Sequence, residues 1–186
     1  MTSETNPGKR KSSVGRGPGS GVAGILPSAG TTTAASHIAA LEIDPDTYQI
    51  HLTDFVVAED CGRLVNPLIV DGQVHGGVAQ GIGAALYEQV VYDGDGQIHT
   101  ASLVDYLVPS AAEIPRMKVA HLESASPATL GGFRGMGEGG TIGGPAAVAN
   151  AVADALSPLG IEIVELPITP ERLFRLIEAA RASAKT

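Results

Sequence analysis

Apolar residues recur every four positions between Pro67 and Val91, which is the spacing of one face of an α-helix. The pattern predicts a helix over this range, with a buried stripe made of Val70, Val74, Val78, Ile82, Leu86 and Val90. Glycines at positions 72, 76, 77, 81 and 83 interrupt the helix, and each costs up to about 1 kcal/mol relative to alanine. Close packing of another backbone or of a ligand is the natural compensation, because only glycine leaves room for it.

Strand patterns flank this helix. His37 to Ile43 and Tyr48 to Val57 are rich in β-formers, and the turn residues Asp44 to Asp46 between them predict a hairpin. Tyr92 to Thr100 carries a turn signal, and Met117 to Glu123 is a further candidate strand. Mixed strands beside a glycine-rich helix predict an α+β fold in a single domain.

The last part of the chain predicts a glycine-dense loop followed by two helices. The loop runs from Gly131 to Gly144, and an alanine-rich helix from Pro145 to Leu156 follows it. Thr169 and Pro170 form an N-cap signature that opens a final helix to about Ala182.

Composition divides the chain into two parts. Residues 1 to 35 are rich in glycine, serine and threonine and bury too little apolar surface to offset chain entropy, so they are predicted to be a flexible tail. Residues 36 to 186 then form one domain. Twelve basic against 20 acidic residues give a net charge of -8, which disfavours nucleic-acid binding. No apolar run reaches the length of a membrane span, and the lone Cys61 fits a reducing compartment, so a cytoplasmic location is expected.

Two polar residues are candidates for chemistry. Glu138 stands among the glycines of Gly135 to Gly140, where its carboxylate is either a presented base or a solvated turn residue. This hexapeptide also fits a dinucleotide-binding fingerprint, but Thr129 to Phe133 is not the hydrophobic strand that must precede one. Gln80 offers amide donors and an acceptor suited to an oxo or pterin group, although a structural amide has the same features.

Three motifs taken together resemble the molybdenum hydroxylases, the family of xanthine dehydrogenase, aldehyde oxidase and carbon monoxide dehydrogenase. They are Asp60 to Pro67, Gly72 to Gly83 and Gly135 to Gly140, and their order and spacing match as well. Ser102 to Pro109 and Leu166 to Glu171 look like further signatures, so the resemblance runs from about residue 37 to 181. It concerns only the C-terminal, molybdopterin-binding part of that family's large subunit.

The resemblance implies a role for each matching residue. Glu138 matches the catalytic glutamate, the base that activates a molybdenum-bound hydroxyl group, and Gln80 matches a glutamine that contacts the pterin. Gly137 matches the backbone position beside the molybdenum centre, and Arg134 stands where the family usually has a lysine. Further cofactor contacts are implied for Gln73, Gly77 and Gly81.

The same resemblance implies the cofactors, substrates and partners. The cofactor is molybdopterin, in bacteria typically the cytosine dinucleotide form, whose dithiolene holds the metal without protein ligands. Iron–sulfur clusters and FAD are expected on partner subunits, and the substrate is an aldehyde, an N-heterocycle or carbon monoxide, with water as the oxygen source. The family's large subunit is several times longer than this chain. Two explanations are open, namely an enzyme completed by a separate upstream chain and a truncated remnant that serves as a non-catalytic interaction module.

Overall fold

The structure is a computed structural model that describes residues 31–183, so most of the predicted tail at residues 1 to 35 lies outside the described residues. The elements in chain order are β1 (Ala34–Ile43), β2 (Ile50–Asp60), α1 (Pro67–Leu86), β3 (Arg116–Leu122), α2 (Gly139–Leu156), a short 3-10 helix η1 (Ser157–Leu159) and α3 (Pro170–Ser183). Mixed strands and helices confirm the predicted α+β class.

The three strands form one mixed sheet in the order β1-β2-β3. β1 and β2 are antiparallel, as the predicted hairpin requires, and the Asp44 carboxylate accepts hydrogen bonds from the amides of Asp46 and Thr47, both at 2.8 Å. Tyr48 takes a left-handed conformation (φ 59°), so β2 begins at Ile50 and not at Tyr48. β2 and β3 are parallel, and α1 provides the crossover that parallel neighbours need.

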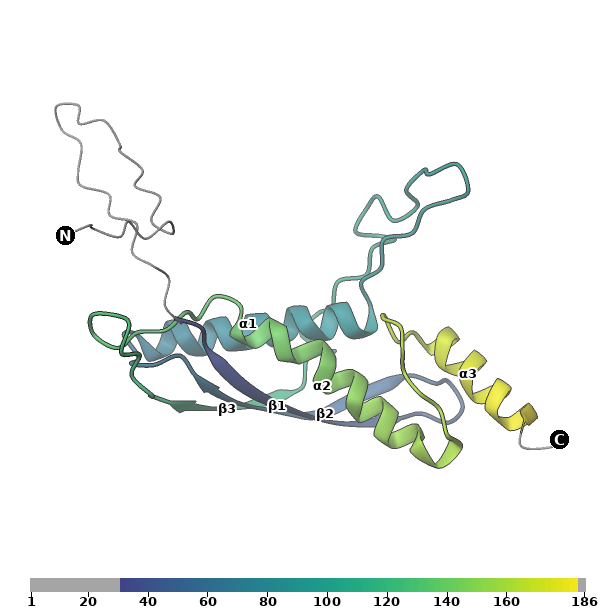
Figure 1. The fold of residues 1–186 in the computed structure, drawn as a ribbon. Coiled ribbons are helices and arrows are strands. Elements are labelled where there is room, and N and C mark those ends of the chain that lie inside the picture. Colours follow the sequence, from purple (N-terminus) through teal and green to yellow (C-terminus); the bar gives the residue numbers. More distant parts are fainter. Residues whose placement is uncertain (1–30, 184–186) are drawn as a thin grey trace, which may run out of the picture.

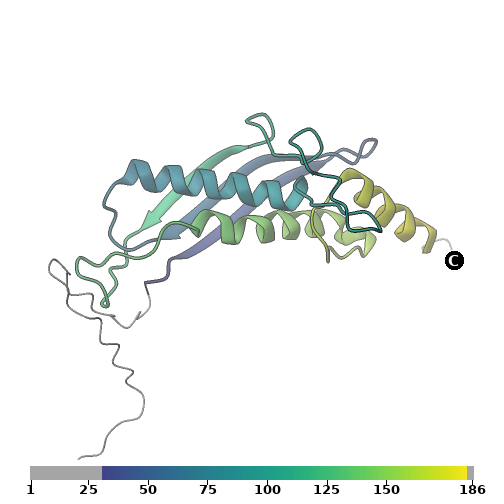
Figure 2. The same cartoon turned by 90° about the horizontal axis from the view of Figure 1, so that it is seen from above.

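α1 and α2 lie side by side on one face of the sheet, and α3 lies at one end (Figures 1 and 2). The helix-facing side of β2 carries Phe55, Val57 and Glu59, all fully buried. The aliphatic core lies between this face and the two helices. Thr169 caps the N-terminus of α3 as predicted, because its hydroxyl oxygen accepts a hydrogen bond from the amide of Arg172 at 3.2 Å.

The predicted stripe on α1 is buried from Val70 to Leu86, but the predicted end at Val91 is wrong. The carbonyl oxygen of Gly83 accepts from the amides of both Tyr87 (2.9 Å) and Glu88 (2.8 Å), which ends the regular hydrogen-bond ladder. Val90 is 51% exposed in the loop beyond.

The predicted start of α2 at Pro145 is also wrong, because the helix begins at Gly139 within the supposed loop. A Cβ atom on Gly140 would lie 2.5 Å from the carbonyl oxygen of Val74, and one on Gly81 would lie 3.0 Å from the Cα atom of Gly144. The glycines thus let two helix backbones touch, and this contact compensates for their poor helix propensity.

Residues 87–115 form a long loop whose ends pack against the core at Tyr87 and Ile114 and whose middle stands away from the rest of the molecule (Figure 1). The predicted turn is present in this loop, where the amide of Gly96 donates to the carbonyl oxygen of Asp93 at 3.1 Å. Large apolar side chains are exposed along the loop, including Leu103 (80%) and Val104 (85%). None of the helices within residues 31–183 is both long enough and apolar enough to cross a bilayer.

Candidate functional site

Glu138 lies at the N-terminus of α2, where the glycine loop meets α1. It is the N-cap residue, and its carbonyl oxygen accepts from the amides of Thr141 (3.0 Å) and Ile142 (3.2 Å). Its side chain is exposed and makes no capping hydrogen bond. The backbone is therefore fixed while the carboxylate stays available.

Two glutamines of α1 hold the chain on either side of Glu138. The Gln73 side-chain amide donates to the carbonyl oxygen of Gly137 at 3.3 Å, and the Thr141 hydroxyl donates to the side-chain oxygen of Gln80 at 3.3 Å. The glutamines are seven residues apart, which is about two helical turns, so both lie on the same face of α1. The structure thus brings Gln73, Gln80, Gly137 and Glu138 together.

Gly77 and Gly81 face α2. A Cβ atom on Gly77 would lie 2.8 Å from the backbone nitrogen of Thr141, and one on Gly81 would lie 3.0 Å from Cδ of Pro145. In this structure the two glycines bring the helix that begins at Glu138 close to α1. A direct contact with a cofactor remains a prediction for them.

Arg134 is tied to the backbone around it. Its Nε atom donates to the carbonyl oxygen of Ser124 at 2.9 Å and its Nη1 atom to that of Thr32 at 3.3 Å. Together with Gln73 and Gly137 it lines a pocket of about 310 Å³ at the N-terminal end of α1. Glu138 and Gln80 do not line this pocket.

Sequence reasoning missed a cluster of buried polar side chains that lies near Gly139, at the end of the glycine loop. Glu59, His37 and His121 point from three neighbouring strands toward the helices, and Glu59 is fully buried. Within residues 31–183, four buried side-chain atoms have no hydrogen-bond partner, and all belong to this cluster: both ring nitrogens of His37, Oε2 of Glu59 and Nδ1 of His121. The signal was present in the alternation of β2, which places position 59 on the same inward face as Phe55 and Val57.

Burial sets the ionisation of this cluster. It raises the pKa of the Glu59 carboxyl, while a hydrogen bond from Thr33 and the nearby His121 oppose the shift. Burial also lowers the pKa of His37, against the effect of the Gly139 carbonyl group. Both shifts favour the neutral forms of the two side chains.

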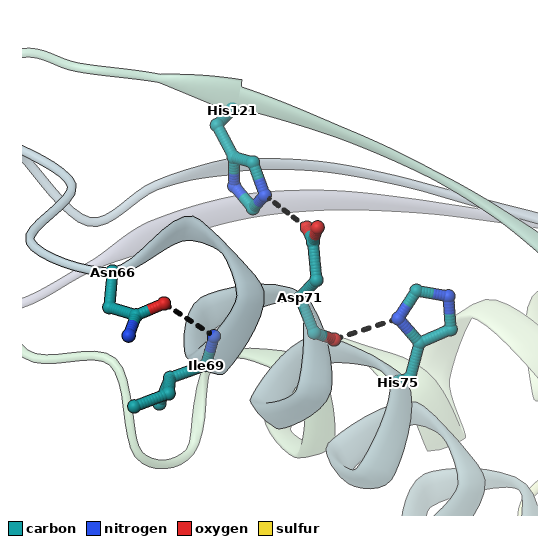
Figure 3. A network of polar contacts seen from close by, with 5 residues as sticks. All are labelled: Asn66, Ile69, Asp71, His75 and His121. Atoms are coloured by element: carbon teal, nitrogen blue, oxygen red, sulfur yellow. Dashed lines mark hydrogen bonds and ion pairs between the residues drawn. The ribbon is translucent and has the colours of Figure 1, made fainter.

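An Asp–His pair connects the cluster to α1 (Figure 3). His121 Nε2 lies 2.7 Å from Oδ1 of Asp71, and His75 Nδ1 lies 2.7 Å from the carbonyl oxygen of Asp71. Asn66 caps the same helix one turn earlier by accepting from the amide of Ile69 at 3.3 Å. The pair fastens the first turns of α1 to β3, and it leaves His75 exposed on the helix.

The chain matches a known class of domain. The family described as the molybdopterin cofactor-binding domain matches residues 19–115, just over half of the chain. The chain belongs to this family. Glu138 lies beyond the matched range, so its role is not part of that finding.

Individual relatives agree with this assignment. The chain is 47% identical over 139 residues to the nicotine 6-hydroxylase large subunit of Paenarthrobacter nicotinovorans, covering 75% of this chain and 17% of that protein. It is 32% identical to the carbon monoxide dehydrogenase large chain of Afipia carboxidovorans, and the match covers 77% of this chain and 18% of that protein. The crystal structure of quinoline 2-oxidoreductase from Pseudomonas putida 86 superposes with a TM-score of 0.75 at 51% identity, covering 76% and 18%. The chain therefore spans less than a fifth of the length of these relatives.

Proposed function

We propose that the chain is the C-terminal, cofactor-facing part of a molybdenum hydroxylase large subunit, which oxidises an aldehyde, an N-heterocycle or carbon monoxide with oxygen from water. The observation that carries this proposal is the placement of Glu138 between two hydrogen bonds that involve glutamines of α1, one donated by Gln73 and one accepted by Gln80, with its own carboxylate free. When bound, the molybdenum cofactor supplies a redox centre that takes up two electrons from the substrate. Glu138 supplies the base.

The residues around Glu138 fit a pterin cofactor. Gln73, Gly76 and Gln80 share one exposed face of α1, and a Cβ atom on Gly76 would meet no atom within 4 Å beyond its chain neighbours and the nearby backbone of its own helix among the described residues. The side-chain nitrogen of Gln80 makes no hydrogen bond within the described residues, because only its oxygen is used, by Thr141. The face thus offers amide donors and acceptors beside a backbone that a flat ring can approach. Gln80, Gln73 and the backbone at Gly137 would hold the cofactor, in its cytosine dinucleotide form.

Glu138 acts by moving a proton. Its carboxylate accepts a proton from the attacking oxygen nucleophile, which general-base catalysis requires to lie within about 2.6 to 3.2 Å or one water molecule away. The hydrogen bonds to Thr141 and Ile142 use only its backbone carbonyl, so both side-chain oxygens remain available. Gly137 and Gly139 keep other side chains away from the carboxylate.

The proposal includes partners. The regions of the large subunit that the relatives have outside the match complete the cofactor site, and iron–sulfur and FAD subunits remove the electrons. The exposed glycines of α1 and the exposed apolar side chains of the loop 87–115 support contact with other protein surfaces. Cys61 is a buried free thiol, which fits a cytoplasmic, reducing location.

Replacement of Glu138 by glutamine tests the proposal in an enzyme assembled with the remaining large-subunit regions and loaded with cofactor. Glutamine keeps the size of the side chain but accepts no proton, so turnover should fall by at least the ~10²-fold typical of losing a general base while molybdenum content stays unchanged. Gln80→Ala should lower molybdenum content as well as turnover. Glu162→Gln, at an exposed position elsewhere, is the matched control and should change neither.

The outcomes separate the two explanations for this chain. Turnover near the wild-type level in Glu138→Gln at full molybdenum content would show that Glu138 is not the base. Loss of cofactor from that variant would make Glu138 a structural residue. An assembled complex that binds no cofactor would favour the non-catalytic interaction module.

A further inference from the structure

The residues just before Glu138, Arg134 and Gly135, are hydrogen-bonded to the segment Thr31 to Thr33. The amide of Gly135 donates to the carbonyl oxygen of Thr31 at 2.5 Å, and Arg134 Nη1 donates to that of Thr32 at 3.3 Å. These bonds join residues about a hundred positions apart in sequence. They hold the loop three residues before Glu138.

The end of the loop rests on Glu59. A Cβ atom on Gly139 would collide with Oε1 of Glu59 and would lie 2.7 Å from its Cδ atom. The carboxyl group therefore occupies the space of a side chain at position 139, directly after Glu138. Gly139 is not among the glycines with positive φ, so contact with Glu59, and not backbone conformation, requires glycine there.

Thr33 connects these two supports. Its hydroxyl oxygen lies 3.1 Å from Oε1 of Glu59 and 2.9 Å from the carbonyl oxygen of Asp60. A hydroxyl group carries one proton, so Thr33 donates to only one of these acceptors at a time. With Thr33 donating to Asp60, a neutral Glu59 donates its own proton to Thr33 and satisfies both contacts.

We propose that Glu59, held by Thr33, is a positioning residue for Glu138: its carboxyl group fixes the first turn of α2 through Gly139 and so sets the direction of the Glu138 side chain. The proposal rests on the proposed function for its effect on catalysis. Its structural part concerns only this chain and is measurable without cofactor.

The polar groups around Glu59 agree with a neutral carboxyl group. His37 faces Glu59 from β1, and His121 faces it from β3. Asp71 of α1 is hydrogen-bonded to His121. Asp60 and Cys61 follow Glu59 in sequence, and Glu138 caps α2. Asp60, Asp71 and Glu138 are acidic, and no lysine or arginine pairs with Glu59 in the described residues. An ionised Glu59 would have only the Thr33 hydroxyl group and the nearby His121 to offset its burial.

The first experiment is amide hydrogen exchange of the free chain in wild type, Glu59→Ala and Glu59→Gln. The amides of Thr141 and Ile142 report the first turn of α2, because both donate to Glu138. In Glu59→Ala their protection should fall at least tenfold relative to the amide of Val152 in the middle of α2. Glu59→Gln keeps the shape and a donor, so protection should return to near the wild-type value.

Val152→Ala is the matched control, because it removes fully buried atoms from the same helix without touching Glu59. It should lower protection along α2 as a whole. A double-mutant cycle with Gly139→Ala, read as free energies of unfolding in urea, adds a second measurement: Gly139→Ala should be tolerated much better in the Glu59→Ala background than in wild type. Equal effects in both backgrounds, or an unchanged ratio of protection between Thr141 and Val152, would overturn the proposal.

The second experiment uses the assembled, cofactor-loaded enzyme. Glu59→Ala should lower kcat at least tenfold with KM and molybdenum content unchanged, Glu59→Gln should restore kcat, and Val152→Ala should leave kcat unchanged. If kcat falls equally in Val152→Ala, Glu59 is merely structural. If Glu138→Gln retains turnover while the exchange results hold, the proposed function has failed and the support of the loop by Glu59 stands.

Discussion

Four glycines of α1 form two groups that differ in what lies opposite them. Gly77 and Gly81 meet the backbone of α2, whereas a Cβ atom added to Gly72 or Gly76 would meet nothing within 4 Å beyond its chain neighbours and the nearby backbone of α1 among the described residues. Every one of them weakens the helix by a similar amount relative to alanine. Only the first group regains that free energy inside the described structure. The first group therefore serves the fold, and the second leaves the backbone open on the face that carries Gln73 and Gln80.

The largest expected effect comes from a residue of α2, Gly140, which packs against Gly77 of the first group. In Gly140→Ala the new methyl group would meet the carbonyl oxygen of Val74 and the Cα atom of Gly77, neither of which can move without separating the helices. Overpacking of this kind costs about 1 to 3 kcal/mol, so the melting temperature should fall by on the order of 5 °C. Thermal unfolding followed by circular dichroism measures this. An unchanged melting temperature would mean that the two helices are not in contact at Gly140.

The opposite sign is expected for the second group. Gly72→Ala and Gly76→Ala each add a methyl group to open space in a helix interior, so each should stabilise the free chain by up to about 1 kcal/mol in urea denaturation. In the assembled enzyme, Gly76→Ala should lower cofactor content. A destabilised free chain would contradict the placement of these residues, and an unaffected cofactor content would show that nothing approaches Gly76.

The free energy of unfolding is expected to depend on pH through Glu59, the ionisable residue that Gly139 contacts. The folded-state pKa of Glu59 is raised above its usual 4.5, so the folded chain binds more protons than the unfolded chain between these values. The contribution of Glu59 to stability is therefore complete below pH 4.5 and declines as the pH rises through this window. In urea denaturation across that range, Glu59→Gln should gain stability relative to wild type. Glu113, whose pKa is lowered by hydrogen bonds from Ser110, gives a control in which Glu113→Gln should lose stability relative to wild type as the pH rises. Parallel curves of unfolding free energy against pH for wild type and Glu59→Gln would refute the expectation.

The smallest effect is expected at Gly83. A Cβ atom there would collide with the end of the Glu88 side chain, which can rotate away at the loss of its 2.6 Å hydrogen bond from the Tyr106 hydroxyl. That loss is worth about 1 kcal/mol and is offset by a similar gain in helix propensity. The melting temperature of Gly83→Ala should stay within about 2 °C of wild type. A large fall would place Gly83 with the backbone-contacting group.

Periodicity predicted most of the fold because burial follows it directly. The stripe from Val70 to Leu86, the hairpin turn at Asp44 and the cap at Thr169 are all local signals, and all are confirmed. The start of α2 was not predicted, because the run from Gly139 to Gly144 has the composition of a loop. Its helical conformation depends on contact with α1, which is absent from any local pattern.

In the candidate site, too, some features could be predicted from local sequence patterns and others depend on tertiary contacts. The motif around Glu138 and the glutamines of α1 could be singled out, but their hydrogen bonds to one another depend on the approach of the two helices. Glu59 lies about eighty residues before Glu138 and carries no motif of its own. Its contact with Gly139 follows from the inward face of β2 and the start of α2, so it required the three-dimensional arrangement.

The long loop between α1 and β3 offers a practical position for engineering. Its first end is fixed where the amide of Ile168 donates to the carbonyl oxygen of Ala85 at 2.7 Å, and its second end continues directly into β3. When both ends of a loop are anchored, doubling its length costs only about 0.6 kcal/mol in chain entropy. A fluorescent label or an epitope tag inserted near Asp95, in the exposed turn, is therefore expected to leave the domain folded. The same tolerance makes this loop the segment in which related chains can differ most in length while keeping the helices and the sheet unchanged.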